Sequence, residues 1–178
     1  MAACCPPVAR FPPRLVPNPF TPSTHLMASL TEDDLRLFVD AIKHYLKTTS
    51  RQEPEITSAF LGDDTVQGFE YNGLVSFMGG YTGYVMVSMP AAMLRDLLVL
   101  QHEHNVSEAN LLDAVGEIAN TLAGNARKVF GPQLDISVPA CLRGVQTIMA
   151  RVRKRPYVIT FRWSNYAALV CVDLERQG

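Results

Sequence analysis

Three polar side chains recur at helical spacing in the stretch DAVGEIANTLAGNARKVF, which begins at Asp113. Asp113, Glu117 and Asn120 are four and three residues apart, so in a helix that turns by roughly 100° per residue they project from one face. A carboxylate accepts hydrogen bonds and pairs with cations, and a side-chain amide both donates and accepts. The pattern therefore predicts a face from which a carboxylate and an amide can reach the same partner molecule.

The helix that carries these residues has clear ends. Ser107 is a candidate N-cap, and Gly131 with Pro132 stops the helix, so we expect it to run from about Glu108 to Phe130. The apolar stripe on its other side is expected to be buried and consists of Leu112, Val115, Ala119, Leu122, Ala126 and Val129.

Two glycines and a basic residue surround the polar face, namely Gly116, Gly124 and Arg127. Glycine in an exposed helix interior costs about 1 kcal/mol relative to alanine, and beside short polar groups it leaves a shallow surface that admits another molecule. Two other interpretations remain open, because polar residues opposite an apolar stripe are usually a solvated face and helix glycines often serve close packing within a domain. The spacing alone does not decide among the three.

The other segments predict the elements that must position this helix. Thr31 is expected to cap a first helix that reaches about Lys47, and Pro90 to open a short helix through Leu100. Strands are expected at 55–62, 73–80 and 81–89, and later at LDISV, VQTIMARV, YVITFRW and YAALVCVDL. Because the strand connections are mostly of the hairpin type, we expect an α/β mixture of the α+β type, with a largely antiparallel sheet covered by helices.

The composition divides the chain into two parts. Of 178 residues, 16 are Lys or Arg and 17 are Asp or Glu, which leaves a net charge of -1. Seven of the twelve prolines lie within residues 6–22, and no acidic residue precedes Glu32. We therefore expect residues 1–26 to form a proline-rich disordered tail and residues 27–178 one slightly acidic domain, with Met27 as a plausible start of the compact protein. This balance argues against nucleic-acid and membrane partners.

The remaining reactive side chains give no sign of a metal or cofactor on this chain. Cys141 and Cys171 have apolar neighbours and no CxxC spacing, which is typical of buried thiols in a cytoplasmic protein. His102 and His104 alternate in a polar loop and do not form a zinc-binding pattern. The tail lacks the continuous apolar segment of an export signal, so we expect a cytoplasmic location, and the basic run at 151–155 is expected to be a solvated strand end or turn.

The string Asp113-x3-Glu117-x2-Asn120 closely resembles the signature helix of the CheC/CheX/FliY group of chemotaxis phosphatases. GLVSFMGGYTGYVMVSMP is similar to that group's glycine-marked hairpin and the short helix after it, and ISVPACLRG to its strand after the catalytic helix. The resemblance covers about residues 30–150. Pro139 lies nearer to the signature helix than the group's pattern places its proline, which predicts a shortened connection.

Within this group the chain resembles CheX. It offers one E-x-x-N helix where the CheC branch carries two, since the first helix has only Asp40 and Lys43 at that spacing. The resemblance implies a CheC/CheX-like fold with one long signature helix, and a homodimer.

The resemblance also implies an activity, which is hydrolysis of the aspartyl phosphate on a CheY-like response regulator. Asn120 would orient the attacking water and Glu117 would bind a receiver lysine, as the two catalytic residues. Docking of the partner is assigned to Asp113, Gly116, Gly124 and Arg127. The chain would carry no cofactor, because the divalent metal is expected on the receiver domain.

Two alternatives to an enzyme remain. One is a non-catalytic CheX-like dimeric module that binds a response regulator or a flagellar-motor component. The other is a structural dimeric adaptor, which is favoured only if the side chains of Glu117 and Asn120 are buried or paired within the domain.

Overall fold

The computed structural model describes residues 30–62, 67–144 and 156–177. The proline-rich tail, the basic run at 151–155 and the predicted strand VQTIMARV lie outside the described residues. The boundary at Met27 therefore stays a prediction.

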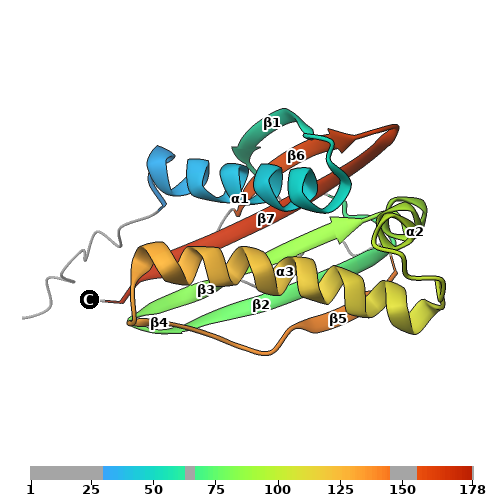
Figure 1. Ribbon diagram of the computed structural model, residues 1–178. Coiled ribbons are helices and arrows are strands. Elements are labelled where there is room, and N and C mark those ends of the chain that lie inside the picture. Colours follow the sequence, from blue (N-terminus) through green and yellow to red (C-terminus); the bar gives the residue numbers. More distant parts are fainter. Residues whose placement is uncertain (1–29, 63–66, 145–155, 178) are drawn as a thin grey trace, which may run out of the picture.

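The described strands form one sheet in which all neighbours are antiparallel (Figure 1). Its order is β1-β6-β7-β3-β2-β4, and β5 also pairs with β2. β4 pairs with the C-terminal end of β2 and β5 with its N-terminal end, so the two short strands follow one another along the same edge. The strands are β1 (Glu55–Leu61), β2 (Tyr71–Gly79), β3 (Tyr81–Met89), β4 (Leu134–Ile136), β5 (Ala140–Arg143), β6 (Tyr157–Trp163) and β7 (Tyr166–Arg176).

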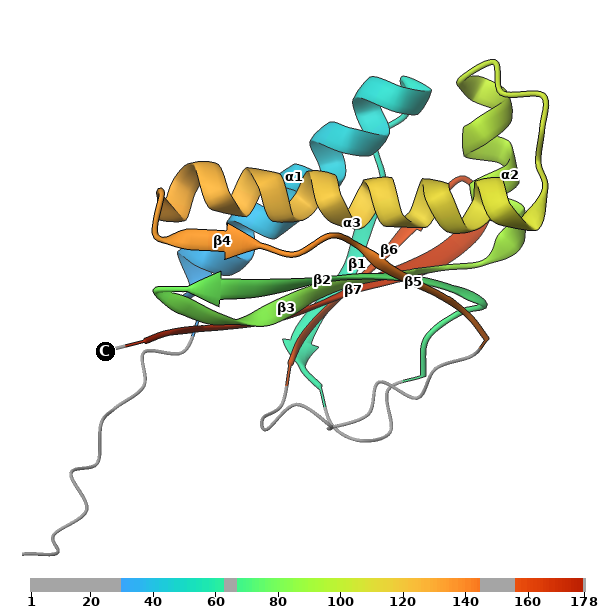
Figure 2. The same ribbon diagram turned by 90° about the horizontal axis from the view of Figure 1, so that it is seen from below.

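The described helices α1 (Glu32–Ser50), α2 (Ala91–Leu100) and α3 (Glu108–Phe130) lie on one side of this sheet (Figure 2). The arrangement confirms the predicted α+β fold, with a largely antiparallel sheet covered by helices. In both views α3 runs over β2 and β3, and the strip formed by β4 and β5 runs beside it (Figures 1 and 2).

The order of elements repeats once along the chain. A helix, an edge strand and a hairpin occur as α1, β1 and β2-β3, and again as α3, β4 with β5, and β6-β7. Each edge strand pairs with the hairpin of the other half, because β1 pairs with β6 while β4 and β5 pair with β2. The two halves therefore complete one another's part of the sheet.

Local signals explain where the helices begin and end. Thr31 and Asp34 form a reciprocal capping box, in which each side chain accepts a hydrogen bond from the other residue's backbone N–H, at 3.2 Å and 2.8 Å. At α3 the Ser107 hydroxyl accepts from the N–H of Asn110, and Gly131 takes the left-handed φ of 88° that follows the last turn. Both predicted caps and the predicted bounds of α3 are confirmed.

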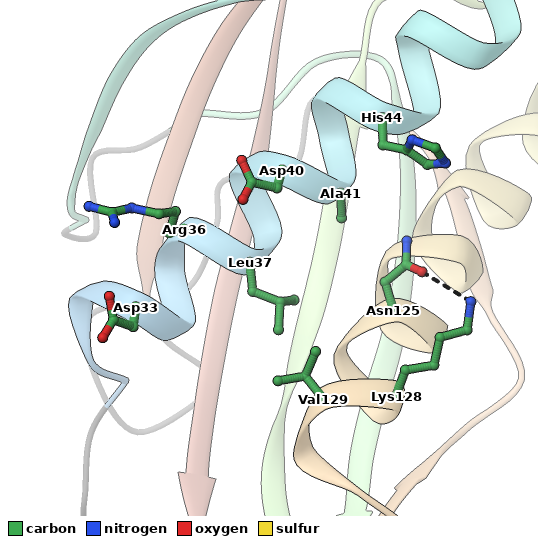
Figure 3. A pocket seen from close by; sticks show the side chains of 9 residues that line it. All are labelled: Asp33, Arg36, Leu37, Asp40, Ala41, His44, Asn125, Lys128 and Val129. Atoms are coloured by element: carbon green, nitrogen blue, oxygen red, sulfur yellow. Dashed lines mark hydrogen bonds between the residues drawn. The ribbon is translucent and has the colours of Figure 1, made fainter.

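The core lies between the helices and the sheet. Val115, Ala119, Leu122 and Ala126 are buried as predicted, together with Leu111 and Ile118, which the predicted stripe did not include. Two members of that stripe depart from the prediction, because Leu112 is only half-buried and Val129 is 65% exposed. Val129 lies in the last turn of α3, where it lines an open groove between α3 and α1 (Figure 3).

Candidate functional site

A glycine in the sheet fixes how closely α3 approaches β2. A Cβ atom added to Gly73 would collide with the backbone carbonyl oxygen of Val115. With no side chain at Gly73, the backbone of α3 lies directly against the strand, and the buried stripe of the helix is pressed into the core. This contact sets which face of α3 points outward.

The outward face carries the predicted polar residues. Asp113 and Glu117 are exposed and Asn120 is half-buried. Among the described residues no hydrogen bond or ion pair engages the side chains of these three. The structural adaptor required Glu117 and Asn120 to be buried or paired internally, and the structure gives no support for that requirement.

The two glycines beside this face have different surroundings. Gly124 is half-buried, and a Cβ at that position would meet no atom within 4 Å. Gly116 is buried, and a Cβ there would lie 2.6 Å from Cys141 Sγ and 3.5 Å from Pro139 Cβ. The surroundings of Gly116 favour the other interpretation of a helix glycine, close packing of α3 against β5 within the domain, and its predicted docking role stays a prediction. Gly124 keeps its predicted open surface.

Ion pairs fasten the strip of β4 and β5 to both ends of α3. Arg127 Nη2 lies 3.7 Å from Asp135 Oδ1 next to the last turn, and Arg143 on β5 pairs with Glu108 in the first turn. Half of the Arg127 side chain remains accessible, so the guanidinium can still meet a partner. Both pairs are exposed, and such pairs contribute roughly 0–1 kcal/mol each. They define the position of the strip more than they stabilise the fold.

The polar face influences the thiol beside it. Burial raises the pKa of Cys141, and the carboxylates of Asp113 and Glu117 raise that pKa further. The thiol therefore stays protonated near neutral pH and is a poor nucleophile. Cys141 borders the site as a packing residue.

A tyrosine from α1 lies on the other flank. Burial raises the pKa of Tyr45, hydrogen bonds with Thr49 and Gln101 lower it, and the charge of Glu117 raises it. Glu117 thus acts electrostatically on groups from α1 and from β5. It occupies the middle of the helical surface between these two elements.

The polar face of α3 was predictable from the sequence, but the residues that border it were not. Asp135, Cys141 and Arg143 delimit the site along β4 and β5, and the sequence indicated them only through the predicted strand LDISV and the segment ISVPACLRG after the helix. Charges and an apolar residue in so short a segment do not reveal which helix turn they will contact. Within the described residues, no group of three or more His, Cys, Asp or Glu side chains could hold a metal ion, and no helix is long and apolar enough to span a membrane.

Comparison with known proteins identifies the family of this chain. The sequence profile of the family described as chemotaxis phosphatase CheX matches residues 71–162, which is more than half of the chain. This range includes the hairpin β2-β3, all of α3 and the strip beside it. No curated protein sequence matches the chain significantly.

Solved structures share the fold at low sequence identity. Chemotaxis protein CheX from Vibrio vulnificus is 20% identical with a TM-score of 0.69, over 80% of this chain and 99% of the other. A CheC-like superfamily protein from Shewanella sp. PV-4 is 19% identical with a TM-score of 0.71, over 82% and 99%. A chain of the CheX-CheY-BeF3-Mg complex from Borrelia burgdorferi is 17% identical with a TM-score of 0.64, over 80% and 97%.

The profile and the structures agree with one another. The profile match covers the helix that bears Asp113, Glu117 and Asn120, and the matching structures cover at least four-fifths of the chain. The chain belongs to the CheX family of chemotaxis phosphatases.

Proposed function

We propose that this protein hydrolyses the aspartyl phosphate of a CheY-like response regulator. Membership of a family named for chemotaxis phosphatases supports the reaction class, and a structural relative was solved in complex with CheY. The observation that carries the proposal is the outward face of α3. There a carboxylate and an amide lie one turn apart, and no described residue engages their side chains.

The one contribution that the reaction requires from this chain is to position the attacking water molecule. The receiver supplies the phosphoryl group, the divalent metal and the charge stabilisation that phosphoryl transfer needs. The Asn120 amide oxygen would accept a hydrogen bond from the attacking water while its NH2 group donates to a phosphoryl oxygen. Holding the water in line converts a rare encounter into a favoured one.

Glu117 has the complementary task of binding the partner. Its carboxylate is exposed on the same face, one turn before Asn120, and would form an ion pair with a lysine of the receiver. Asp113, one further turn towards the N-terminus, and the accessible half of Arg127 would add docking contacts. Gly124 would let a loop of the receiver approach the helix backbone.

A second candidate function is a CheX-like module that docks a response regulator or a flagellar-motor component without hydrolysis. The same exposed face would serve it, so the contacts alone do not separate the two. The presence of both Glu117 and Asn120 favours the enzyme, because docking needs no amide placed to hold a water.

The experiment follows phosphate loss from a phosphorylated response regulator of the same cell. Wild-type protein is expected to accelerate the loss catalytically. Asn120→Ala is expected to reduce the acceleration at least about 100-fold, the cost of losing a positioned reactant. Glu117→Ala is expected to reduce it roughly 10- to 100-fold, as removal of a charged hydrogen bond does.

Asn125→Ala is the matched control, since it removes the same amide from the same helix at a residue that contacts Lys128. It should hydrolyse at the wild-type rate. Equal rates of phosphate loss with wild type and with Asn120→Ala would contradict the catalytic role assigned to Asn120. Binding of the phosphorylated regulator without any acceleration would establish the docking module instead.

We further expect a cytoplasmic homodimer. β1 is an edge strand with Phe60 and Leu61 exposed by 42% and 48%. An edge of this kind offers free backbone groups and apolar contact area to another strand. The expectation comes from the resemblance to CheX, and β1 is the described edge that fits it.

A further inference from the structure

A groove of about 530 Å³ separates α1 from the last turns of α3. Leu37 on α1 and Val129 on α3 point toward one another across it, and Ala41 lies beside them (Figure 3). Val129 is 65% exposed, which is unusual for a residue on the apolar side of a core helix. The groove therefore has an apolar floor that no described residue covers.

The charge along the α1 side of the groove is acidic once existing contacts are counted. Asp33 and Asp40 line it two turns apart on one face, and neither forms an ion pair with any described residue. Arg36 between them is already paired with Glu32, at 3.5 Å. This side of the groove therefore suits a basic occupant with apolar side chains.

The α3 side carries one cation. Lys128 Nζ donates a hydrogen bond to Asn125 Oδ1 at 3.4 Å, which holds the ammonium group on α3 (Figure 3). Arg36, Lys43 and Lys47 of α1 pair with Glu32 or Glu53, so among the described residues neither Asp33 nor Asp40 has an ion-pair partner on its own helix. An occupant lying along α1 would meet these two carboxylates first.

A segment of this composition precedes α1 in the same chain. Residues 10–16 read RFPPRLV, and no acidic residue occurs before Glu32. In an extended proline-type backbone, which rises about 3.1 Å per residue, two residues four positions apart, as Arg10 and Arg14 are, would lie roughly 12 Å apart. Asp33 and Asp40 are about 10 Å apart along the helix, at 1.5 Å per residue. The two spacings match within the reach of an arginine side chain.

The connection is long enough for the segment to turn back. Residues 17–31 separate it from the start of α1 at Glu32, and such a length spans up to about 50 Å when extended. The described chain begins at Leu30, one turn before Asp33 at the end of the groove. A tether of this kind supplies an effective concentration on the order of 1 mM, so weak contacts are sufficient.

We propose that residues 10–16 of this chain bind in the groove, antiparallel to α1. Arg14 pairs with Asp33 and Arg10 with Asp40, while Phe11 and Leu15 cover the apolar floor at Leu37. The interaction is intramolecular and does not depend on the proposed phosphatase activity.

Limited trypsin digestion of the full chain tests the proposal. The reaction is followed by mass spectrometry at the Arg14-Leu15 bond, whose cleavage rate reports the undocked fraction of the segment. Asp40→Lys is expected to accelerate this cleavage about tenfold by placing like charge opposite Arg10. Glu55→Lys is the matched control, because it makes the same charge change at an exposed residue of β1, and it should leave the rate unchanged.

A double variant that exchanges the two charges is the decisive test. Arg10→Glu combined with Asp40→Lys restores the ion pair with reversed polarity and is expected to recover wild-type protection of the Arg14-Leu15 bond. Equal cleavage in wild type and Asp40→Lys, or no recovery in the exchanged pair, would overturn the proposal. Protection that rises with protein concentration would overturn it as well, because it would place the segment of one molecule in the groove of another.

Discussion

Cys141 on β5 occupies the notch that Gly116 leaves in α3, and a Cβ atom at residue 116 would lie 2.6 Å from its sulfur. The contact joins the border strip to the helix midway between the ion pairs at its two ends. It also places a half-buried thiol within the electrostatic influence of Asp113 and Glu117.

Gly116→Ala is expected to destabilise the fold by about 1–3 kcal/mol, the usual cost of overpacking, which exceeds the gain of up to about 1 kcal/mol in helix propensity. Adding Cys141→Ala should recover much of this loss, because it removes the atom that clashes. The measurement is urea unfolding of both single variants and the double variant. Additive effects would contradict the contact, since residues that touch are expected to couple.

Gly124→Leu is expected to leave stability equal or slightly higher, because the added side chain meets no atom of the domain and leucine favours helix. If a receiver loop approaches this glycine, the variant should raise KM for the phosphorylated regulator at least about tenfold with kcat little changed. Thr121→Leu, at an exposed residue of the same helix, is the control and should keep the wild-type KM. An unchanged KM in Gly124→Leu would remove this glycine from the docking surface.

Cys171 makes the stability of the protein sensitive to alkaline pH. Burial raises the pKa of its thiol from 9.0 to about 12, so the folded state keeps a proton that the unfolded state releases. This thiol's contribution is complete below pH 9 and is lost as the pH rises towards 12, by up to about 1.4 kcal/mol per pH unit. Urea unfolding from pH 8 to pH 10.5 should show a shallower decline for Cys171→Ala than for wild type. Parallel declines would contradict the assignment.

If the protein is the proposed homodimer paired through β1, Phe60→Lys is expected to convert it to a monomer, because a lysine on an exposed edge strand discourages strand pairing. Light scattering should then report a mass near 19.7 kDa for the variant and twice that value for wild type. Val138→Lys is the control, since Val138 is 88% exposed next to the opposite edge of the sheet. Loss of the dimer in Val138→Lys alone would move the interface to that edge.

Much of the fold followed from local signals. The bounds of α3 were predictable because Ser107 caps it and Gly131 ends it, and the hairpin because glycines separate two strongly apolar strands. The face bearing Asp113, Glu117 and Asn120 was predictable because helical periodicity fixes which residues point together.

The features that could not be predicted all depend on contacts between distant segments. The packing of Gly116 was not predictable because nothing in its sequence neighbourhood indicates Cys141, which lies on a strand of only four residues. Val129 continues the buried periodicity of α3, but the groove beside it exists only through the way α1 and α3 pack. Periodicity describes one element at a time and contains no information about where a neighbouring element stops.

The pairing of β1 with β6 has a consequence during synthesis of the chain. Residues 55–61 leave the ribosome about a hundred residues before their partner, residues 157–163. Until then β1 has no neighbour in the sheet, and its later pairing closes a loop of about a hundred residues, which slows folding. β1 can therefore enter the sheet only after β6 has been synthesised, and a ribosome that stalls before β6 holds a chain whose β1 is unpaired and exposed to chaperones.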